Sequence, residues 1–194
     1  MEITSVQLKE LRDMTGISVM QCKKALEEAG GDMEKAVIIL KKKRSEAADK
    51  KSDREIGAGA IGAYVHNTNE VATLVLLGCE TDFVSKNEEF VALARDIAMH
   101  VAATNPTYIT KAEVPAEALK KAEEVFAAEV LDKPADMQAK IIEGKMASYF
   151  KEQILLEQPF IKNPETTIGE MITGAVQKFG ENVSVVRISR LSVK

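Results

Sequence analysis

Apolar residues recur at helical spacing over the first 44 residues of the chain. Leu8 and Leu11 share one face of a helix that Thr4 or Ser5 can cap and that ends before Gly16. Two further segments with the same spacing each follow a capping residue and are separated by a glycine pair. The two caps and the separator are Ser18, Asp32 and Gly30-Gly31. This pattern predicts three short helices that pack as a small bundle.

The apolar pattern changes to strand spacing after residue 56. Ile61, Ala63 and Val65 alternate with neighbours that are polar or small, which is typical of a strand. A turn-like stretch at 66–69 then leads to an apolar run at 71–77. Both faces of this second strand are apolar, so we expect helices or a partner protein to cover it. The two segments predict a β-hairpin.

Amphipathic helices and a last strand complete the predicted fold. Five apolar residues at steps of three and four predict a long helix: Phe90, Leu93, Ala94, Ile97 and Val101. Residues 115–156 predict two more helices, broken near 132–134, and residues 167–179 predict another. Residues 182–188 predict a strand that can join the hairpin. The expected class is α+β: a three-helix, ubiquitin-associated-like bundle, then a small antiparallel three-stranded sheet packed with helices.

A charged stretch separates the two predicted domains. Residues 41–54 hold seven cations against three anions, a net charge of +4, and no apolar side chain larger than alanine. We therefore expect a three-helix domain over 1–44, a charged linker over 45–56 and an α+β core over 57–194. A nucleic-acid-binding patch is the alternative. It is the weaker one, because no aromatic residue stands among the charges for bases to stack on.

Composition and charge argue against several classes of protein. The net charge of −4 at pH 7 creates no global basic field of the kind that drives binding to nucleic acid. No apolar run approaches the ~20 residues of a membrane-spanning helix. The two cysteines, Cys22 and Cys79, are too few for a disulfide framework and lack metal-ligand spacing. We expect a cytoplasmic protein with no cofactor, no metal and no direct contact with nucleic acid or membrane.

Residues 57–62 match the spacing GxGxxG without its context. A dinucleotide-binding loop follows a strand and opens a helix, whereas here a charged stretch precedes the glycines and a strand follows. We expect the glycines to permit close packing at the sheet instead. Enzymatic activity also finds little support, because Cys79 has no histidine beside it in the sequence to act as a base. An active site built from Cys79 and Asp82 is the remote alternative.

The most informative stretch is CETDFV at residues 79–84. It follows the second strand and precedes a helix, so Asp82 and Phe83 lie on a short connection between rigid elements. Binding residues concentrate on such loops. Phe83 either folds back onto the core or projects as a contact residue, and the pattern leaves both open. His100 lies about 80° from the apolar stripe of its helix, at the boundary between core and surface.

Several motifs, in order along nearly the whole chain, resemble the elongation factor Ts family. That family promotes nucleotide exchange on the GTPase elongation factor Tu. The motifs are LRDMTG at 11–16, MQCKKAL at 20–26, GD at 31–32, KA at 35–36, CETDFV at 79–84, IAMHVA at 97–102, QPF at 158–160 and GENV at 180–183. The resemblance implies a guanine-nucleotide exchange factor of translation elongation that is not an enzyme.

The resemblance also implies roles for particular residues. Asp82 and Phe83 would enter the G domain of elongation factor Tu and disturb its magnesium site, with Thr81 and Val84 framing the loop. The residues implied to dock on that domain or to lie near the loop are Arg12, Val19, Met20, Lys23 and His100. Val19 stands where the family often has a methionine.

The resemblance is to the short, single-core form of the family. Longer members carry a duplicated core and an inserted helical hairpin, and we expect this chain to depart from them, since it shows no internal repeat. Two copies could pair to supply the missing half, so we expect a homodimer that uses the apolar second strand. The alternative function is a non-exchanging module that binds a helix or a ubiquitin-like surface and dimerises through its core.

Overall fold

The chain forms two units, which are described separately. The computed structural model describes residues 3–131 and 133–193, apart from the side chains of residues 135 and 136. The first unit combines Met1–Glu55 with Thr173–Val183, and the second combines Ile56–Ile172 with Ser184–Lys194. The change at 55/56 falls inside the stretch expected as a linker. The grouping of Thr173–Val183 with the N-terminal helices was not foreseen.

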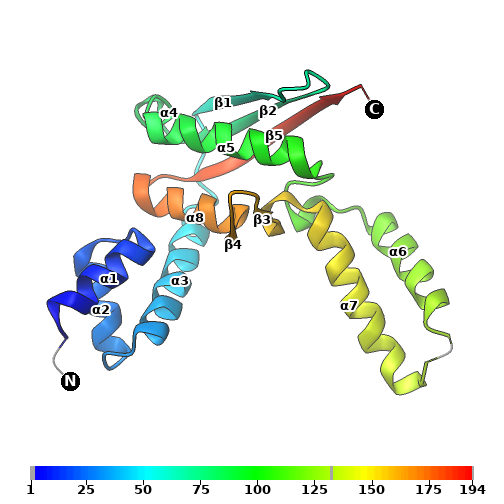
Figure 1. Cartoon of the computed structure of the whole chain (residues 1–194), viewed down its shortest axis with the longest axis horizontal. Coiled ribbons are helices and arrows are strands. Elements are labelled where there is room, and N and C mark those ends of the chain that lie inside the picture. The colour runs from blue at the N-terminus through cyan, green and yellow to red at the C-terminus, as the bar shows by residue number, and fades with distance from the viewer. Residues whose placement is uncertain (1–2, 132, 194) are drawn as a thin grey trace. The chain divides into compact units, whose positions relative to one another are not determined.

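Three helices make up most of the first unit (Figure 1). They are α1 (Ser5–Thr15), α2 (Val19–Glu28) and α3 (Met33–Asp49). Each begins after a predicted cap, because the side chains of Thr4, Ser18 and Asp32 accept hydrogen bonds from the backbone N–H three residues later. The predicted helices and caps are confirmed.

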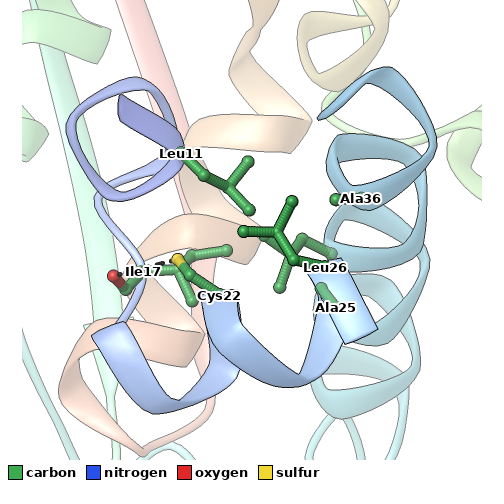
Figure 2. Close-up of a cluster of buried hydrophobic side chains, with 7 residues drawn as sticks. Leu11, Ile17, Cys22, Ala25, Leu26 and Ala36 are labelled. Carbon is green, nitrogen blue, oxygen red and sulfur yellow. Dashed lines mark hydrogen bonds between the residues drawn. The ribbon is translucent and has the colours of Figure 1, made fainter. Parts of the chain in front are cut away.

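The core of this bundle is small and well buried. Leu11, Leu26 and Ala36 have no exposed surface, and Figure 2 shows their side chains converging between the three helices. Cys22 is also fully buried, and its Sγ donates a weak hydrogen bond to the carbonyl oxygen of Ile17 at 3.6 Å. The thiol is therefore a packing group, as free cysteines usually are.

Helix α3 is longer than the sequence suggested. We expected it to end at residue 44, but it continues to Asp49 and is followed by turns at 50–54. That end was wrong because Lys, Arg, Glu and Ala dominate 41–49, all good helix formers, and no glycine or proline interrupts them. Only residues 55–57 lie outside helix, turn or strand at this junction.

A three-stranded sheet forms the centre of the second unit. Its strands are β1 (Ala58–Val65), β2 (Val71–Cys79) and β5 (Val183–Ser192), in the order β1-β2-β5. β1 and β2 pair antiparallel, with Ile61 opposite Leu76 and Ala63 opposite Leu74. The predicted hairpin, its third strand and the α+β class are confirmed.

Helix α5 (Glu88–Thr104) covers one face of this sheet (Figure 1). Val75 and Leu77 of β2 are fully buried on that face, as is Ile97 of α5. The hydroxyl of Thr73 donates a hydrogen bond of 2.6 Å to the carbonyl oxygen of Ala98. Close packing and this buried hydrogen bond hold α5 on the sheet, and α5 begins just after the candidate site.

The remaining elements of the second unit include a helical hairpin. Helices α6 (Ala116–Glu129) and α7 (Ala135–Gln153) lie side by side, with the rings of Phe126 and Tyr149 in edge contact at 5.7 Å. The two predicted helices are thus confirmed, but the expected lack of a hairpin was wrong, because these helices pair with each other. The shorter elements are η1 (Lys111–Glu113), η2 (Leu155–Glu157), β3 (Pro159–Phe160) and β4 (Asn163–Thr167). Helix α8 (Ile168–Phe179) passes from the second unit into the first.

Candidate functional site

Residues 79–84 form a rigid turn between β2 and α5. One helical turn, α4 (Asp82–Ser85), occupies the connection. The thiol of Cys79 donates to the carbonyl oxygen of Thr81 at 3.2 Å, and the hydroxyl of Ser85 donates to that of Asp82 at 3.1 Å. Asn87 then caps α5 by accepting from the backbone N–H of Glu89 at 2.9 Å. The site is therefore held at both ends.

Two neighbouring apolar residues of α4 point in opposite directions. The side chain of Val84 is only 4% exposed and anchors the turn in the core. The side chain of Phe83 is 83% exposed, the largest exposed fraction among the large apolar side chains of the described residues. Of the two alternatives for Phe83, the structure selects the projecting one. Val84, which the resemblance implies to frame the loop together with Thr81, is buried in the protein.

Asp82 carries a negative charge beside the exposed ring. Its carboxylate pairs with the ammonium of Lys86, one helical turn later, at 2.6 Å. The hydrogen bond from Lys86 and its charge lower the pKa of Asp82 below the ordinary value of 3.8. Because both side chains are about three-quarters exposed, a partner could replace Lys86 at little cost.

His100 is buried, and it lies away from this turn. It has no exposed surface, although its angle on the helix had suggested the boundary. It follows the start of α5 by 12 residues, which is about 18 Å of helix. The structure therefore does not bring His100 to the loop, and a contact with a partner would require this ring to become accessible.

A hydrogen-bond network defines the protonation state of His100. Gln158 donates its amide to the carbonyl oxygen of Glu152, which turns its Oε1 toward His100 Nε2 at 2.8 Å. A carbonyl oxygen only accepts, so Nε2 carries the proton. The backbone N–H of Ile161 donates to Nδ1 at 3.4 Å. The ring is therefore neutral, and two of the motifs noted in the sequence, around His100 and Gln158, form one structural pair.

This network predicts acid sensitivity. Burial lowers the pKa of His100 below 6.5, so the folded protein takes up this proton later than the unfolded chain. The free energy of unfolding should therefore fall as the pH drops below about 6.5, by at most about 1.4 kcal/mol per pH unit from this group. Denaturant unfolding from pH 8 to 5 measures the slope. His100→Gln should remove the histidine part of it, whereas His66→Gln, at an exposed position, should not. Equal slopes in the two variants would contradict the assignment.

The four other predicted docking residues lie on the first unit. Val19 and Met20 are 51% and 70% exposed, and Lys23 and Arg12 are exposed as well. The first three lie on α2 away from its buried side, which faces the bundle core. All four are exposed, two with apolar and two with cationic side chains. We call these four residues the docking face.

One exposed apolar residue beside this region was missed. Met14 is 67% exposed, and with Val6 and Asp13 it lines a shallow groove on α1. Met14 follows the buried Leu11 by three residues on the same helix. Because Met14 is spaced from the buried Leu11 as members of one apolar stripe are, the sequence pattern does not indicate its exposure.

The described residues offer little to a catalytic or metal centre. No group of three or more His, Cys, Asp or Glu side chains in this part of the chain is placed to hold a metal ion. Cys79 is fully buried and bonded to the backbone. The stretch at 57–62 runs into β1, with no helix after it. Among the helices within the described ranges, none has the length and apolar character needed to cross a membrane.

The chain is similar in sequence to known proteins over nearly its whole length. The family model described as "Elongation factor TS" matches residues 48–194. The chain is 47% identical over 193 residues to elongation factor Ts of Carboxydothermus hydrogenoformans, covering 98% of this chain and 89% of that protein. It is 47% identical over 194 residues to elongation factor Ts of Thermodesulfovibrio yellowstonii, covering 100% and 97%. The factor of Thermotoga petrophila is 44% identical over 193 residues, with coverage of 100% and 97%.

The helical bundle, the α+β core with its projecting turn and these matches together define a class. The protein is a translation elongation factor. Within that class, the chain belongs to the elongation factor Ts family.

Proposed function

We propose that the protein is a guanine-nucleotide exchange factor that binds elongation factor Tu and promotes the release of GDP. The observation that carries the proposal is the exposed Phe83 on a turn fixed by the buried Val84. A free protein gains nothing by holding a large apolar ring in water, whereas burial of such a ring in a partner contributes about 1.5–3 kcal/mol. The membership of the family supports the choice of partner.

The mechanism needs binding only. GDP and its magnesium ion hold a GTPase closed, and local charge and packing at the metal maintain that state. Phe83 inserts into the G domain and displaces the elements around the magnesium site, while Asp82 brings a carboxylate to the same place. A factor that prefers the nucleotide-free state must weaken nucleotide binding to the same extent, because the coupling is reciprocal. We propose no covalent step and no enzymatic activity.

The docking face supplies affinity for the same partner. Val19 and Met20 offer apolar area that is already exposed, and Arg12 and Lys23 offer charge beside it. A partner surface with an apolar centre and acidic rim would complement this face. We propose that the two surfaces have different roles. The docking face provides affinity for the partner, and the Phe83 turn disturbs its magnesium site. Translation takes place in the cytoplasm, and we propose that location.

Release of labelled GDP from elongation factor Tu tests the function. The wild type should accelerate release by a large factor at catalytic concentration, and Asp82→Ala should slow it by removing the charge at the displaced site. If the wild type binds elongation factor Tu without any acceleration, the exchange function is wrong. That outcome would favour the alternative, a binding module without exchange activity.

We also propose that two copies pair through the uncovered face of the sheet. Ile61, Val65 and Leu74 are 65%, 62% and 52% exposed on the face opposite α5. The register places Ala63 beside Leu74 on that face, and Val186 of β5 is 47% exposed. An exposed apolar sheet face of this kind marks an interaction surface. A second copy offers the same face, which suits a two-fold interface.

Leu74→Arg is expected to convert the homodimer to a monomer, because it would bury two charges without partners at the interface. Light scattering after gel filtration should give twice the chain mass of 21.2 kDa for the wild type and the single mass for the variant. Val125→Arg, at an exposed position of α6, is the matched control and should remain dimeric. A wild type with the single mass at every concentration would contradict the pairing.

A further inference from the structure

The side chain of Asn182 is hydrogen-bonded to the charged segment that follows α3 in the first unit. Nδ2 of Asn182 lies 2.8 Å from the carbonyl oxygen of Arg54 and 3.1 Å from that of Ser52, and donates to both. An asparagine amide has two N–H donors, so these bonds use both of them. Asn182 is only 7% exposed. A buried amide that spans two carbonyls of one turn holds that turn in a defined place.

The segment itself is entirely polar. Residues 50–54 read KKSDR and include no apolar side chain, so hydrophobic burial cannot hold them. Backbone hydrogen bonds at 3.2 Å and 3.0 Å, from Ser52 to Asp49 and from Arg54 to Lys51, give the segment the form of a turn. These bonds are local, and they shape the turn without fixing its position. The long-range bonds from Asn182 contribute to that position.

Asn182 lies where the chain leaves the first unit. One exit follows Glu55, and another follows Val183, the residue after Asn182. The amide of Asn182 therefore links the two places, after Glu55 and after Val183, where the chain leaves the first unit. The third passage between the units lies inside the continuous helix α8. Only residues 55–57 are left without helix, turn or strand before β1. The sequence predicted a linker of twelve residues at 45–56, whereas in the structure the irregular connection is only residues 55–57.

We propose that Asn182 is a positioning residue that clamps segment 50–54 and so keeps the docking face and the Phe83 turn on a short, ordered connection. The proposal rests on the proposed function, in which both surfaces bind one partner. Two surfaces on one chain reinforce each other through their effective concentration, which falls as the connection between them lengthens and loosens. Ordering the connection before binding also removes an entropic cost from the binding step.

Limited proteolysis tests the clamp without reference to exchange. Lys50, Lys51 and Arg54 are cleavage sites for trypsin inside the clamped segment. Asn182→Ala and Asn182→Asp should each raise the initial rate of cleavage there by about tenfold or more, because the segment opens more often once these bonds are lost. Asn163→Ala alters an exposed asparagine of the second unit, and trypsin should cleave this variant at the same rate as the wild type. Equal rates in the wild type and the Asn182 variants would overturn the clamp.

Exchange kinetics test the positioning role. Asn182→Ala should raise the concentration of factor needed for half-maximal GDP release about fivefold and leave the maximal rate unchanged. A merely structural defect would lower the maximal rate through loss of folded protein and would leave the half-maximal concentration in place; that result would overturn the role. If the proposed function is wrong, the wild-type protein will not accelerate GDP release. The trypsin experiment still tests in that case whether Asn182 holds segment 50–54.

Discussion

Phe83→Ala is expected to lower the efficiency of GDP release from elongation factor Tu by about 30-fold or more, the equivalent of about 2 kcal/mol. The ring is 83% exposed in the free protein, so its removal leaves no cavity. The whole loss should therefore appear in the complex, where the ring acts as the buried anchor of the contact. Stopped-flow measurement of labelled GDP release gives the efficiency, and thermal unfolding should show no loss of stability.

A matched control exists on the helical hairpin. Leu131 is 77% exposed and lies outside both proposed binding surfaces, so Leu131→Ala removes similar apolar area from water without touching the site. This variant should accelerate GDP release as efficiently as the wild type. If Phe83→Ala and Leu131→Ala behaved alike, the wedge would be excluded even if the protein remained an exchange factor.

Gly62→Ala is expected to destabilise the second unit by about 3 kcal/mol or more. A Cβ at position 62 would lie 2.0 Å from the carbonyl oxygen of Ala94 and 2.7 Å from the backbone nitrogen of Arg95. These are backbone atoms of α5, so no side-chain rotation relieves the contact, and the helix would have to lift from β1. The melting temperature should fall by roughly 6–12 °C.

Gly144→Ala, the same substitution at another position, is expected to have the opposite effect on stability. Gly144 lies in the middle of α7, and no atom lies within 4 Å of the place its Cβ would take. A helix interior favours alanine over glycine, so this variant should be more stable by about 0.5–1 kcal/mol. Calorimetry of both variants compares them directly. Similar stability changes would show that the contact between β1 and α5 is not close.

The local elements were predictable because their signals are local. Thr4, Ser18 and Asp32 cap helices at places where a short polar side chain precedes a periodic apolar segment. The hairpin followed from alternation and a turn-like stretch. The end of α3 was misjudged because a run of charges was taken as a linker, although charged residues with alanine are good helix formers.

The place of the candidate site in the fold was predictable from the sequence, but the directions of its side chains were not. The stretch at 79–84 was found from its position between a strand and a helix, but the opposite directions of Phe83 and Val84 depend on where α4 meets the strands. His100 illustrates the same limit. Its angle on the helix suggested the boundary, and full burial arises because Gln158, distant in the sequence, packs against it.

The sequence by itself determined the helices, the strands, the α+β class and the position of the candidate site, because periodicity, caps and turns act between neighbours in the chain. Only the tertiary structure decided that Phe83 projects, that His100 is a neutral core group, and that Asn182 holds the turn at residues 52–54. These outcomes depend on contacts between residues far apart in the chain. No local pattern encodes which distant atoms will meet, so packing alone settles them.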